Sequence, residues 1–280
     1  MMLKGLYTAT SAMITQQRRT EMLTNNIANA NTPGYKEDQG SIRSFPEMLL
    51  SRIESDSVKA GSASRSFSTQ TPIGSINTGV YMQELKPQFS QGDLQSTNAP
   101  TDIAISETEV PVNGETNDKA ALFYTVRLEN GDVRYSRSSR FSLNENNQLT
   151  INGRLVLSTE NRPITVGSEN FQVAEDGTVT ENGQNLGRID VRIALDTRNL
   201  AREGDDLYRT ENGEALPSAV GNPEVTYSVK QGMTERSNVD VTRAYTEMTA
   251  AYRSFEANQK VLQAYDKSME KAANEIGRIG

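Results

Sequence analysis

The feature that most constrains this chain is a row of mainly apolar residues near its C-terminal end, spaced alternately three and four positions apart. Residues at this spacing fall on one face of an α-helix. A row that continues for about five heptads is typical of a helix that packs against other helices along its whole length. This C-terminal seam consists of Val241, Ala244, Met248, Ala251, Phe255, Asn258, Leu262, Tyr265, Met269, Ala272, Ile276 and Ile279.

The C-terminal seam predicts one long helix from Asn238 to Ile276. Ser237 and Asp240, three residues apart, suit its start, although Asp is a weaker match than Glu to the capping box, and Gly277 suits its end. At about 1.5 Å per residue the helix is roughly 58 Å long, which exceeds the width of a small domain. We therefore expect other helices to cover the seam.

The N-terminal end repeats the pattern in a weaker form. An Asn-rich segment and Pro33-Gly34 follow it, and they predict a helix exit because Asn side chains can bind freed carbonyls and Pro-Gly favours a turn. We expect helices within residues 1–32 and 230–280, bundled as a coiled coil. The N-terminal seam consists of Met2, Leu6, Ala9, Met13, Gln16, Thr20, Leu23 and Ile27.

One partner helix is not expected to cover the C-terminal helix completely. Tyr245, Tyr252 and Val261 add apolar area beside the C-terminal seam, and so wide a stripe needs more than one neighbour. Self-association is the simplest way to cover it. The alternative is that the two terminal helices bundle within a stable monomer, which accounts for part of this surface.

Residues 33–80 are predicted to form an extended arm that includes a short helix. The short helix starts at Ser44, with Glu47 as its capping-box partner, and its apolar face consists of Met48, Leu49 and Ile53. Residues 55–79 are rich in Ser, Thr, Gly, Gln and Ala and contain few apolar residues, which is typical of a linker. We expect no core in this arm.

Residues 81–229 alternate apolar and polar positions with a period of two, for example at residues 123–128 and 189–195, and this pattern predicts strands. Asn-Gly and Asp-Gly pairs interrupt the strands and indicate hairpins, because tight hairpin turns need positive φ. The fold class is therefore α+β, with long terminal helices around a central antiparallel all-β domain. The turn pairs are Asn130-Gly131, Asn152-Gly153, Asp176-Gly177, Asn182-Gly183 and Asn212-Gly213.

The composition argues against several kinds of chemistry. The chain has no Cys and no His, so it lacks thiol nucleophiles, the usual neutral-pH base and the commonest metal ligands. A net charge of −7 without a basic stripe argues against nucleic acid as a partner. The acidic pairs Asp205-Asp206 and Glu107 with Glu109 are interpreted as solvated surface rather than as a glycosidase acid and base. We predict no catalytic residue, no cofactor and no metal site.

No apolar run of about 18 residues predicts a membrane-spanning helix, and the N-terminus does not resemble a cleaved secretory signal. A membrane-surface helix is also disfavoured at the C-terminus. Its polar face carries both signs of charge, including Glu256 and Lys260 at the spacing that favours an ion pair.

Several different short motifs follow one another along the chain. The first consists of Asn25, Asn26, Ile27, Ala28, Asn29, Ala30, Asn31, Thr32, Pro33, Gly34, Tyr35 and Lys36. The later ones are residues 78–80, 91–94 and 102–105, then Gln231-Gly232, Glu235, residues 237–239, Glu247-Met248, residues 252–258 and Asp266. Together these motifs resemble those of the bacterial flagellar basal-body rod and hook protein family. Residues 106–110 depart from the family's usual Gly-Phe-Phe segment, so the resemblance does not predict the first strand of the central domain.

The resemblance implies a structural subunit, not an enzyme. At this length the chain looks like a distal-rod-type protein that self-assembles helically through its terminal helices and transmits torque between motor and hook. Family membership further implies unfolded export through the flagellar type III apparatus without leader cleavage, location in the flagellar basal body outside the cytoplasm, and contacts with copies of itself and with adjacent rod and hook subunits. A cell-wall hydrolase and a monomeric surface-binding module are the alternatives.

Overall fold

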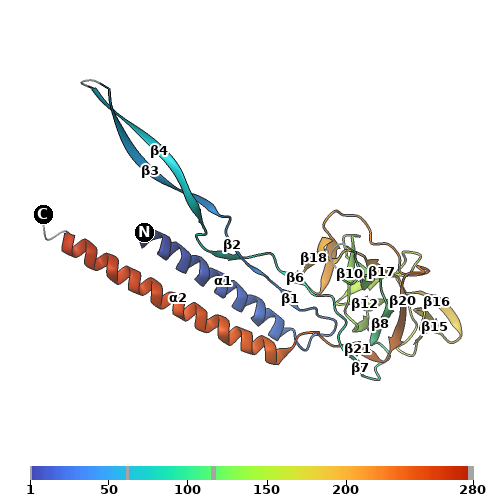
Figure 1. Ribbon diagram of the computed structural model, residues 1–280. Helices are drawn as coiled ribbons and strands as arrows, with labels where there is room; N and C mark the ends of the chain where they lie inside the picture. Colours follow the sequence, from blue (N-terminus) through green and yellow to red (C-terminus); the bar gives the residue numbers. More distant parts are fainter. Residues whose placement is uncertain (1, 61–62, 115–117, 277–280) are drawn as a thin grey trace. The chain divides into compact units, whose positions relative to one another are not determined.

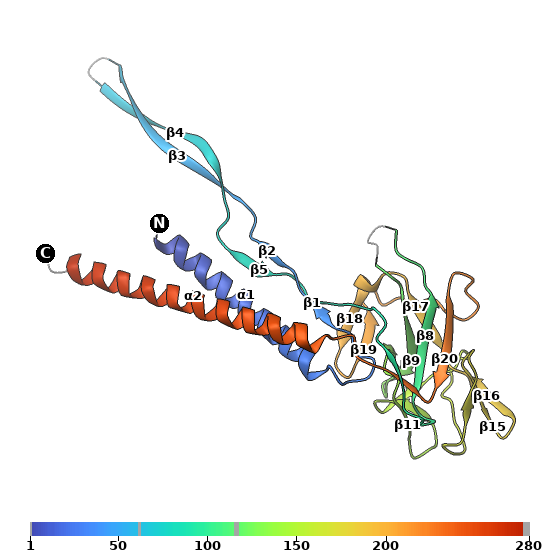
Figure 2. The same cartoon turned by 60° about the horizontal axis from the view of Figure 1, so that its bottom comes forward.

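The computed structural model describes residues 2–60, 63–114 and 118–276 (Figures 1 and 2). The chain divides into two compact units. The helical unit comprises residues 1–24, 40–85 and 243–280, and the β unit comprises residues 25–39 and 86–242. No helix within the described residues is long and apolar enough to cross a membrane.

Two helices, α1 (Met2–Ala28) and α2 (Val241–Ile276), dominate the helical unit. They lie side by side in both views (Figures 1 and 2). Arg19 of α1 forms an ion pair with Glu247 at the start of α2, with 3.0 Å between Nη2 and Oε2. A Cβ placed on Gly5 would collide with the ring of Tyr265, so this glycine allows close approach near the opposite end. The two helices are therefore antiparallel.

Helix α2 buries one narrow stripe of residues, and the predicted C-terminal seam describes this stripe well. Ala244 and Ala251 are buried, and the following seam positions are less exposed than their neighbours. Val241, the first predicted member, is 39% exposed. The side chain of Ile276, and all of Ile279 and the predicted stop Gly277, lie outside the described residues. The partly buried positions are Met248, Phe255, Asn258, Leu262, Tyr265, Met269 and Ala272.

Helix α1 is covered on two faces. Ala9 and Leu23 of the N-terminal seam are buried, and Leu6, Met13, Gln16, Thr20 and Ile27 are partly buried. A second face contacts the segment that contains Gly79 and Val80. There Thr15 donates a hydrogen bond to the carbonyl of Val80, and Ser11 Oγ accepts one from Val80 N.

The arm of the helical unit consists of strands. Strand β2 (Ile42–Ser44) pairs with β5 (Val80–Met82), and the long β3 (Met48–Ala60) pairs with β4 (Ala63–Ile76). The prediction of a short helix from Ser44 was wrong, because two distant strands supply ladder partners that outweigh a local capping signal. The arm is a hairpin with its own backbone pairing.

The β unit is antiparallel throughout its described strand pairs, as the sequence predicted. Its main sheet is built around β9 (Ala121–Arg127), whose first six residues are all buried. In sheet order the other strands are β11 (Phe141–Leu143), β12 (Leu149–Ile151), β13 (Arg154–Val156), then, beyond β9, β10 (Val133–Ser136), β19 (Leu207–Thr210) and β18 (Leu200–Glu203), while β17 (Val191–Ala194) also pairs with β9.

Smaller ladders complete the β unit. Residues 106–109, which differ from the family's usual segment, belong to strand β8 (Ile103–Glu109). Strand β8 pairs with β20 (Thr226–Gln231). The other ladders are β1 (Asp38–Gln39) with β6 (Lys86–Pro87), β7 (Leu94–Ser96) with β21 (Met233–Glu235), and β14 (Gln172–Val173) with β15 (Thr178–Glu181) and β16 (Gln184–Arg188); a short 3-10 helix, η1, spans Thr197–Asn199.

The turn signals mark most of the hairpins. In β12–β13 and β15–β16 both turn residues have positive φ, at Asn152-Gly153 and Asn182-Gly183. Two more pairs lie between β9 and β10 and between β14 and β15. Asn212-Gly213 is different, because the strand before it, β19, pairs with β18 and β10 rather than with the strand that follows.

The core of the β unit lies on both faces of β9. On one face Leu122, Tyr124 and Val126 have no exposed surface and belong to the larger apolar cluster. On the other face Phe123 packs against Phe89 and Tyr208, with ring centroids 5.3 to 5.4 Å apart in this trio. Aromatic pairs at this separation are favourable beyond their buried area.

Candidate functional site

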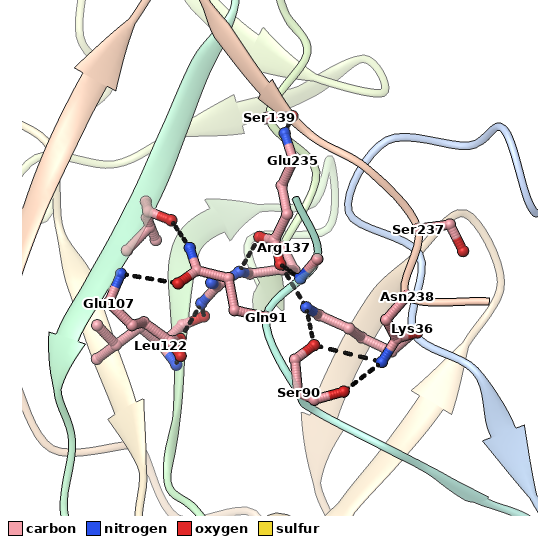
Figure 3. Close-up of polar contacts among 12 residues, drawn as sticks. Lys36, Ser90, Gln91, Glu107, Leu122, Arg137, Ser139, Glu235, Ser237 and Asn238 are labelled. Atoms are coloured by element: carbon pink, nitrogen blue, oxygen red, sulfur yellow. Dashed lines mark hydrogen bonds and ion pairs between the residues drawn. The ribbon is translucent and has the colours of Figure 1, made fainter. Parts of the chain in front are cut away.

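Four charged side chains are buried together in the β unit (Figure 3). Lys36, Arg137 and Glu235 have side chains 1 to 2% exposed, and the side chain of Glu107 is 10% exposed. They come from four separate chain segments. Burying charges is costly unless they are paired and hydrogen-bonded, so this charge cluster requires a close match of partners.

Glu235 lies at the centre of the charge cluster (Figure 3). Its Oε1 accepts hydrogen bonds from Lys36 Nζ at 2.5 Å and from the backbone N–H of Gly92 at 3.0 Å. Its Oε2 accepts one from Arg137 Nε at 2.6 Å. One carboxylate thus accepts hydrogen bonds from two cations and from one backbone N–H group.

The two cations use further acceptors. Arg137 Nη1 donates to Glu107 Oε1 at 2.5 Å and to the carbonyl of Leu122 at 2.6 Å. Lys36 Nζ donates to the carbonyl of Ser90 at 2.9 Å. With two positive and two negative side chains the cluster is neutral, which is how a buried group of charges avoids an unpaired charge.

The pKa values reflect one carboxylate shared by two cations. Burial alone would raise the pKa of Glu235, but the charges of Arg137 and Lys36 outweigh it and hold the pKa below the ordinary 4.5. Burial, together with the positive charge of Arg137, lowers the pKa of Lys36 to about 8 against the opposing effect of Glu235. The surroundings therefore disfavour the charged form of Lys36.

A second polar group holds the segment that follows α1. Asn26 is fully buried; its Nδ2 donates to the carbonyl of Asp38 and its Oδ1 accepts from Asp38 N, both at 2.9 Å. Arg202 donates to Asp38 Oδ2 at 2.8 Å and lies over the ring of Tyr35, 4.5 Å from its centroid. The Tyr35 hydroxyl donates to Asn25 Oδ1 at 2.8 Å. These contacts fold the chain back directly after the helix.

Two glycines are required by close backbone approach. Gly34 has φ +77°, and a Cβ there would lie 2.5 Å from the carbonyl oxygen of Arg137. A Cβ on Gly92 would collide with the carbonyl of Arg236. Side chains are excluded at both places for steric reasons, and at Gly34 also because L residues rarely adopt such a φ.

Most residues of the first motif are therefore buried or partly buried in the β unit. Asn26, Gly34 and Tyr35 are buried, while Ile27, Asn29, Thr32 and Pro33 are partly buried and Asn25, Ala28 and Asn31 are exposed. The predicted role of Asn in ending the helix is visible at Asn29, whose Nδ2 donates to the carbonyl of Asn25 at 2.9 Å.

The C-terminal motif residues meet the same region. Asn238 Oδ1 accepts a hydrogen bond from Glu37 N at 2.7 Å, and its Nδ2 donates to the carbonyl of Gln88 at 2.8 Å. Because this side chain is held there, α2 begins at Val241 and not at the predicted Asn238. The spacing of Glu256 and Lys260 on α2 favours an ion pair. These two described residues form no ion pair with each other.

Sequence reasoning missed the charge cluster. The sequence marks Glu235 only as a motif residue and Glu107 only as an acidic residue near Glu109. No local signal joins Lys36, Arg137 and Glu235, since about a hundred residues separate each from the next. No group of three or more acidic residues that could hold a metal ion is present within the described ranges.

Comparison with known proteins shows that the two terminal segments match models of one protein family. Residues 6–36 match the model described as "Flagella basal body rod protein", and residues 230–275 match "Flagellar basal body rod FlgEFG protein C-terminal". The chain is 70% identical over 278 residues to the flagellar hook-basal body complex protein FlhO of Bacillus subtilis, covering 99% of this chain and all of the relative. The chain belongs to the flagellar basal-body rod and hook protein family.

Other family members are more distant but also match end to end. The flagellar basal-body rod protein FlgG of Caulobacter vibrioides is 30% identical, over 96% of this chain and 97% of the relative. FlgG of Bacillus subtilis is 28% identical, over 98% and 99% respectively. These relatives support a rod-type structural role in the flagellar basal body.

Each matched family segment contains one partner of the central ion pair. Lys36 is the last residue of the first match, and Glu235 lies near the start of the second. The 2.5 Å contact between them joins segments that are 199 residues apart. In this rod-family protein the two terminal motifs are therefore brought together by a buried contact.

Proposed function

We propose that this chain is a subunit of the flagellar basal-body rod that assembles helically with copies of itself through its terminal helices and transmits torque between motor and hook. The observation that carries the proposal is the uneven covering of α2. This helix of 36 residues buries only one narrow stripe, while Tyr245, Tyr252 and Val261 beside it are 44 to 55% exposed.

The terminal helices form the surface expected of a subunit that is completed by its neighbours. The seam positions of α2 repeat at three and four residues, the spacing with which helices pack as a coiled coil. Tyr7 and Ile14 of α1 are also exposed, at 71% and 46%. Apolar side chains gathered on helices in this way mark interaction surfaces.

The remaining parts of the proposal come from family membership. Rod-type relatives support adjacent rod and hook subunits as partners. The chain length and the motif resemblance to distal-rod-type proteins favour a position in the distal rod. We further propose that the chain leaves the cytoplasm through the flagellar type III apparatus without cleavage of a leader. Electron microscopy of basal bodies from a strain lacking this protein tests its position, because the rod stops where the missing subunit belongs.

The assembly role is tested by Leu262→Asp, which places a charge in the C-terminal seam. We expect the variant to be absent from purified basal bodies and the cells to be non-motile, because a charge buried between helices without a partner is costly. Gln263→Asp is the matched control, since Gln263 is an exposed neighbour on α2. Near-ultraviolet circular dichroism of the purified variant should show an unchanged β unit.

Two results would count against this role. Normal basal bodies containing Leu262→Asp would show that the seam is not used in assembly. Loss of the tertiary signal of the β unit would show that the seam packs on that unit instead.

A further inference from the structure

A groove of about 510 Å³ lies in the helical unit between α1 and the β2–β5 ladder. Its α1 wall includes Tyr7, Ile14 and Arg18, and its ladder wall includes Phe45 and Tyr81. The two ladder rings lie 5.3 Å apart, centroid to centroid. Covering large, exposed and mainly apolar walls of this kind is energetically favourable, because it removes apolar surface from water.

The same chain carries a ridge that fits this groove. Tyr245 and Tyr252 are seven residues apart on α2, so they lie on one face about 10.5 Å apart. Tyr7 and Ile14 have the same spacing on α1. Both the ridge and the groove are exposed in the single chain, so only another molecule can bring the two together.

The direction of docking follows from the antiparallel arrangement of α1 and α2. Copies in a helical polymer are related by rotation about and translation along one axis, so they all have the same polarity. The α2 helix of a neighbouring copy is then antiparallel to the α1 helix of this copy. In that direction Tyr252 comes level with Tyr7 when Tyr245 comes level with Ile14.

Charge supports the same register. In the antiparallel alignment Glu256, four residues beyond Tyr252, lies opposite the turn that contains Lys4, three residues before Tyr7. Both side chains are exposed, and neither has an ion-pair partner among the residues the structure describes. A cation and a carboxylate at matching ends of an apolar contact set its register and disfavour alternatives.

We propose that the groove between α1 and the β2–β5 ladder receives the Tyr245–Tyr252 ridge of a second copy, antiparallel, with Glu256 of that copy beside Lys4. This proposal rests on the proposed function and specifies its contact. Groove and ridge are different patches of one molecule, so the interface is heterologous. Such an interface does not close into a two-fold dimer and continues into a ring or a helix.

The absence of cysteine makes the contact directly testable. Cells carrying both Tyr7→Cys and Tyr252→Cys single variants can form a disulfide between them only across two copies. We expect this heterodimer in oxidised, purified basal bodies at about ten times the yield of the pair Tyr7→Cys with Ala250→Cys, because proximity raises the effective concentration of the two thiols. Ala250 is exposed on a different face of α2.

Charge reversal gives an independent measurement. Lys4→Glu and Glu256→Lys are each expected to lower incorporation into basal bodies by roughly tenfold, and the double variant is expected to restore it. Circular dichroism of the purified single variants checks that their folds are unchanged. All of these positions are exposed, so the substitutions are not expected to disturb folding.

The outcomes separate the two levels of the proposal. If the protein is present in basal bodies but the Tyr7–Tyr252 crosslink does not exceed the control and charge reversal has no effect, the docking contact is wrong and the rod assignment stands. If the wild-type chain is absent from basal bodies, the proposed function fails, and the docking contact fails with it.

Discussion

The β unit and the helical unit protect their apolar side chains to very different degrees. In the β unit Leu122, Tyr124 and Ile151 have no exposed surface. In the helical unit Tyr7 is 71% exposed and Tyr252 is 55% exposed. The difference teaches that one chain can combine a unit that closes on its own core with a unit that leaves large apolar side chains exposed.

The same contrast applies to charge. The β unit buries Lys36, Arg137 and Glu235 almost completely, and each has several partners. In the helical unit the ion pair between Arg19 and Glu247 has side chains 35% and 38% exposed. Ion pairs removed from water depend strongly on every partner, whereas exposed pairs contribute little. Substitutions at buried positions are therefore expected to have larger effects than substitutions at exposed ones.

The largest effect is expected for Glu235→Gln. The substitution leaves Lys36 and Arg137 buried beside a neutral amide, and it should lower the free energy of unfolding of the β unit by about 3–5 kcal/mol. Urea unfolding followed by the near-ultraviolet tyrosine signal measures it, since the chain has no Trp. The control is Glu175→Gln, which removes an exposed pair with Lys230 and should leave the midpoint unchanged. Equal effects of the two substitutions would remove the distinction between buried and exposed pairs.

Gly34→Ala is expected to be the next most severe. The new Cβ meets the carbonyl of Arg137 in a backbone conformation that disfavours side chains, at a cost of about 1–3 kcal/mol in unfolding free energy. Gly131→Ala is the matched control, because Gly131 also has positive φ but has open space around its Cβ position. The difference between the two variants isolates the collision, and no difference would show that the backbone at Gly34 can move aside.

The charge cluster also predicts a pH dependence for the β unit. Because the pKa of Glu235 is lower in the folded state than its ordinary 4.5, its contribution to stability is present above pH 4.5 and is lost as pH falls below it. The lowered pKa of Lys36, about 8 against 10.5, means that the unfolded chain binds more protons between these values, so stability rises with pH across that window.

Urea midpoints of the wild type, Glu235→Gln and Lys36→Met test both pH effects. They are measured from about pH 3 to about pH 10, which covers the pKa values of carboxyl groups and most of the range of amino groups. Lys36→Met should flatten the rise above pH 8. A rise that persists unchanged in this variant would assign it to another group.

The smallest effect is expected for Arg19→Ala in the helical unit. The ion pair with Glu247 is more than a third exposed, so solvent screening limits its contribution to about 0.2–1 kcal/mol. Thermal unfolding of the helices, followed by far-ultraviolet circular dichroism, measures it. A loss as large as that of Glu235→Gln would mean that the helical unit is protected from water much more than its single-chain exposure shows.

Local sequence patterns anticipated a large part of this fold. The period of three and four residues placed the stripe on α2 from Ala244 to Ala272, and Asn152-Gly153 and Asn182-Gly183 marked two hairpins through their positive φ. These features depend on residues close together in the chain. The resemblance to the rod and hook family was likewise contained in short motifs, and the comparisons confirm it.

Features that depend on distant partners were anticipated poorly. The segment around Ser44 satisfied a capping rule and was predicted to be helical, but pairing with residues 80–82 makes it a strand. The boundary near Asn238 was three residues early because its side chain binds Glu37 and Gln88. In both cases contacts made across the fold outweighed a weak local preference.

The sequence by itself determined the order of helix, arm, β domain and helix, and the spacing of the seams, because these follow from the periods of side chains along a backbone. Only the tertiary structure decided the charge cluster. Lys36, Arg137 and Glu235 have no local relation, and burial makes each charge dependent on partners that folding alone brings within hydrogen-bonding distance.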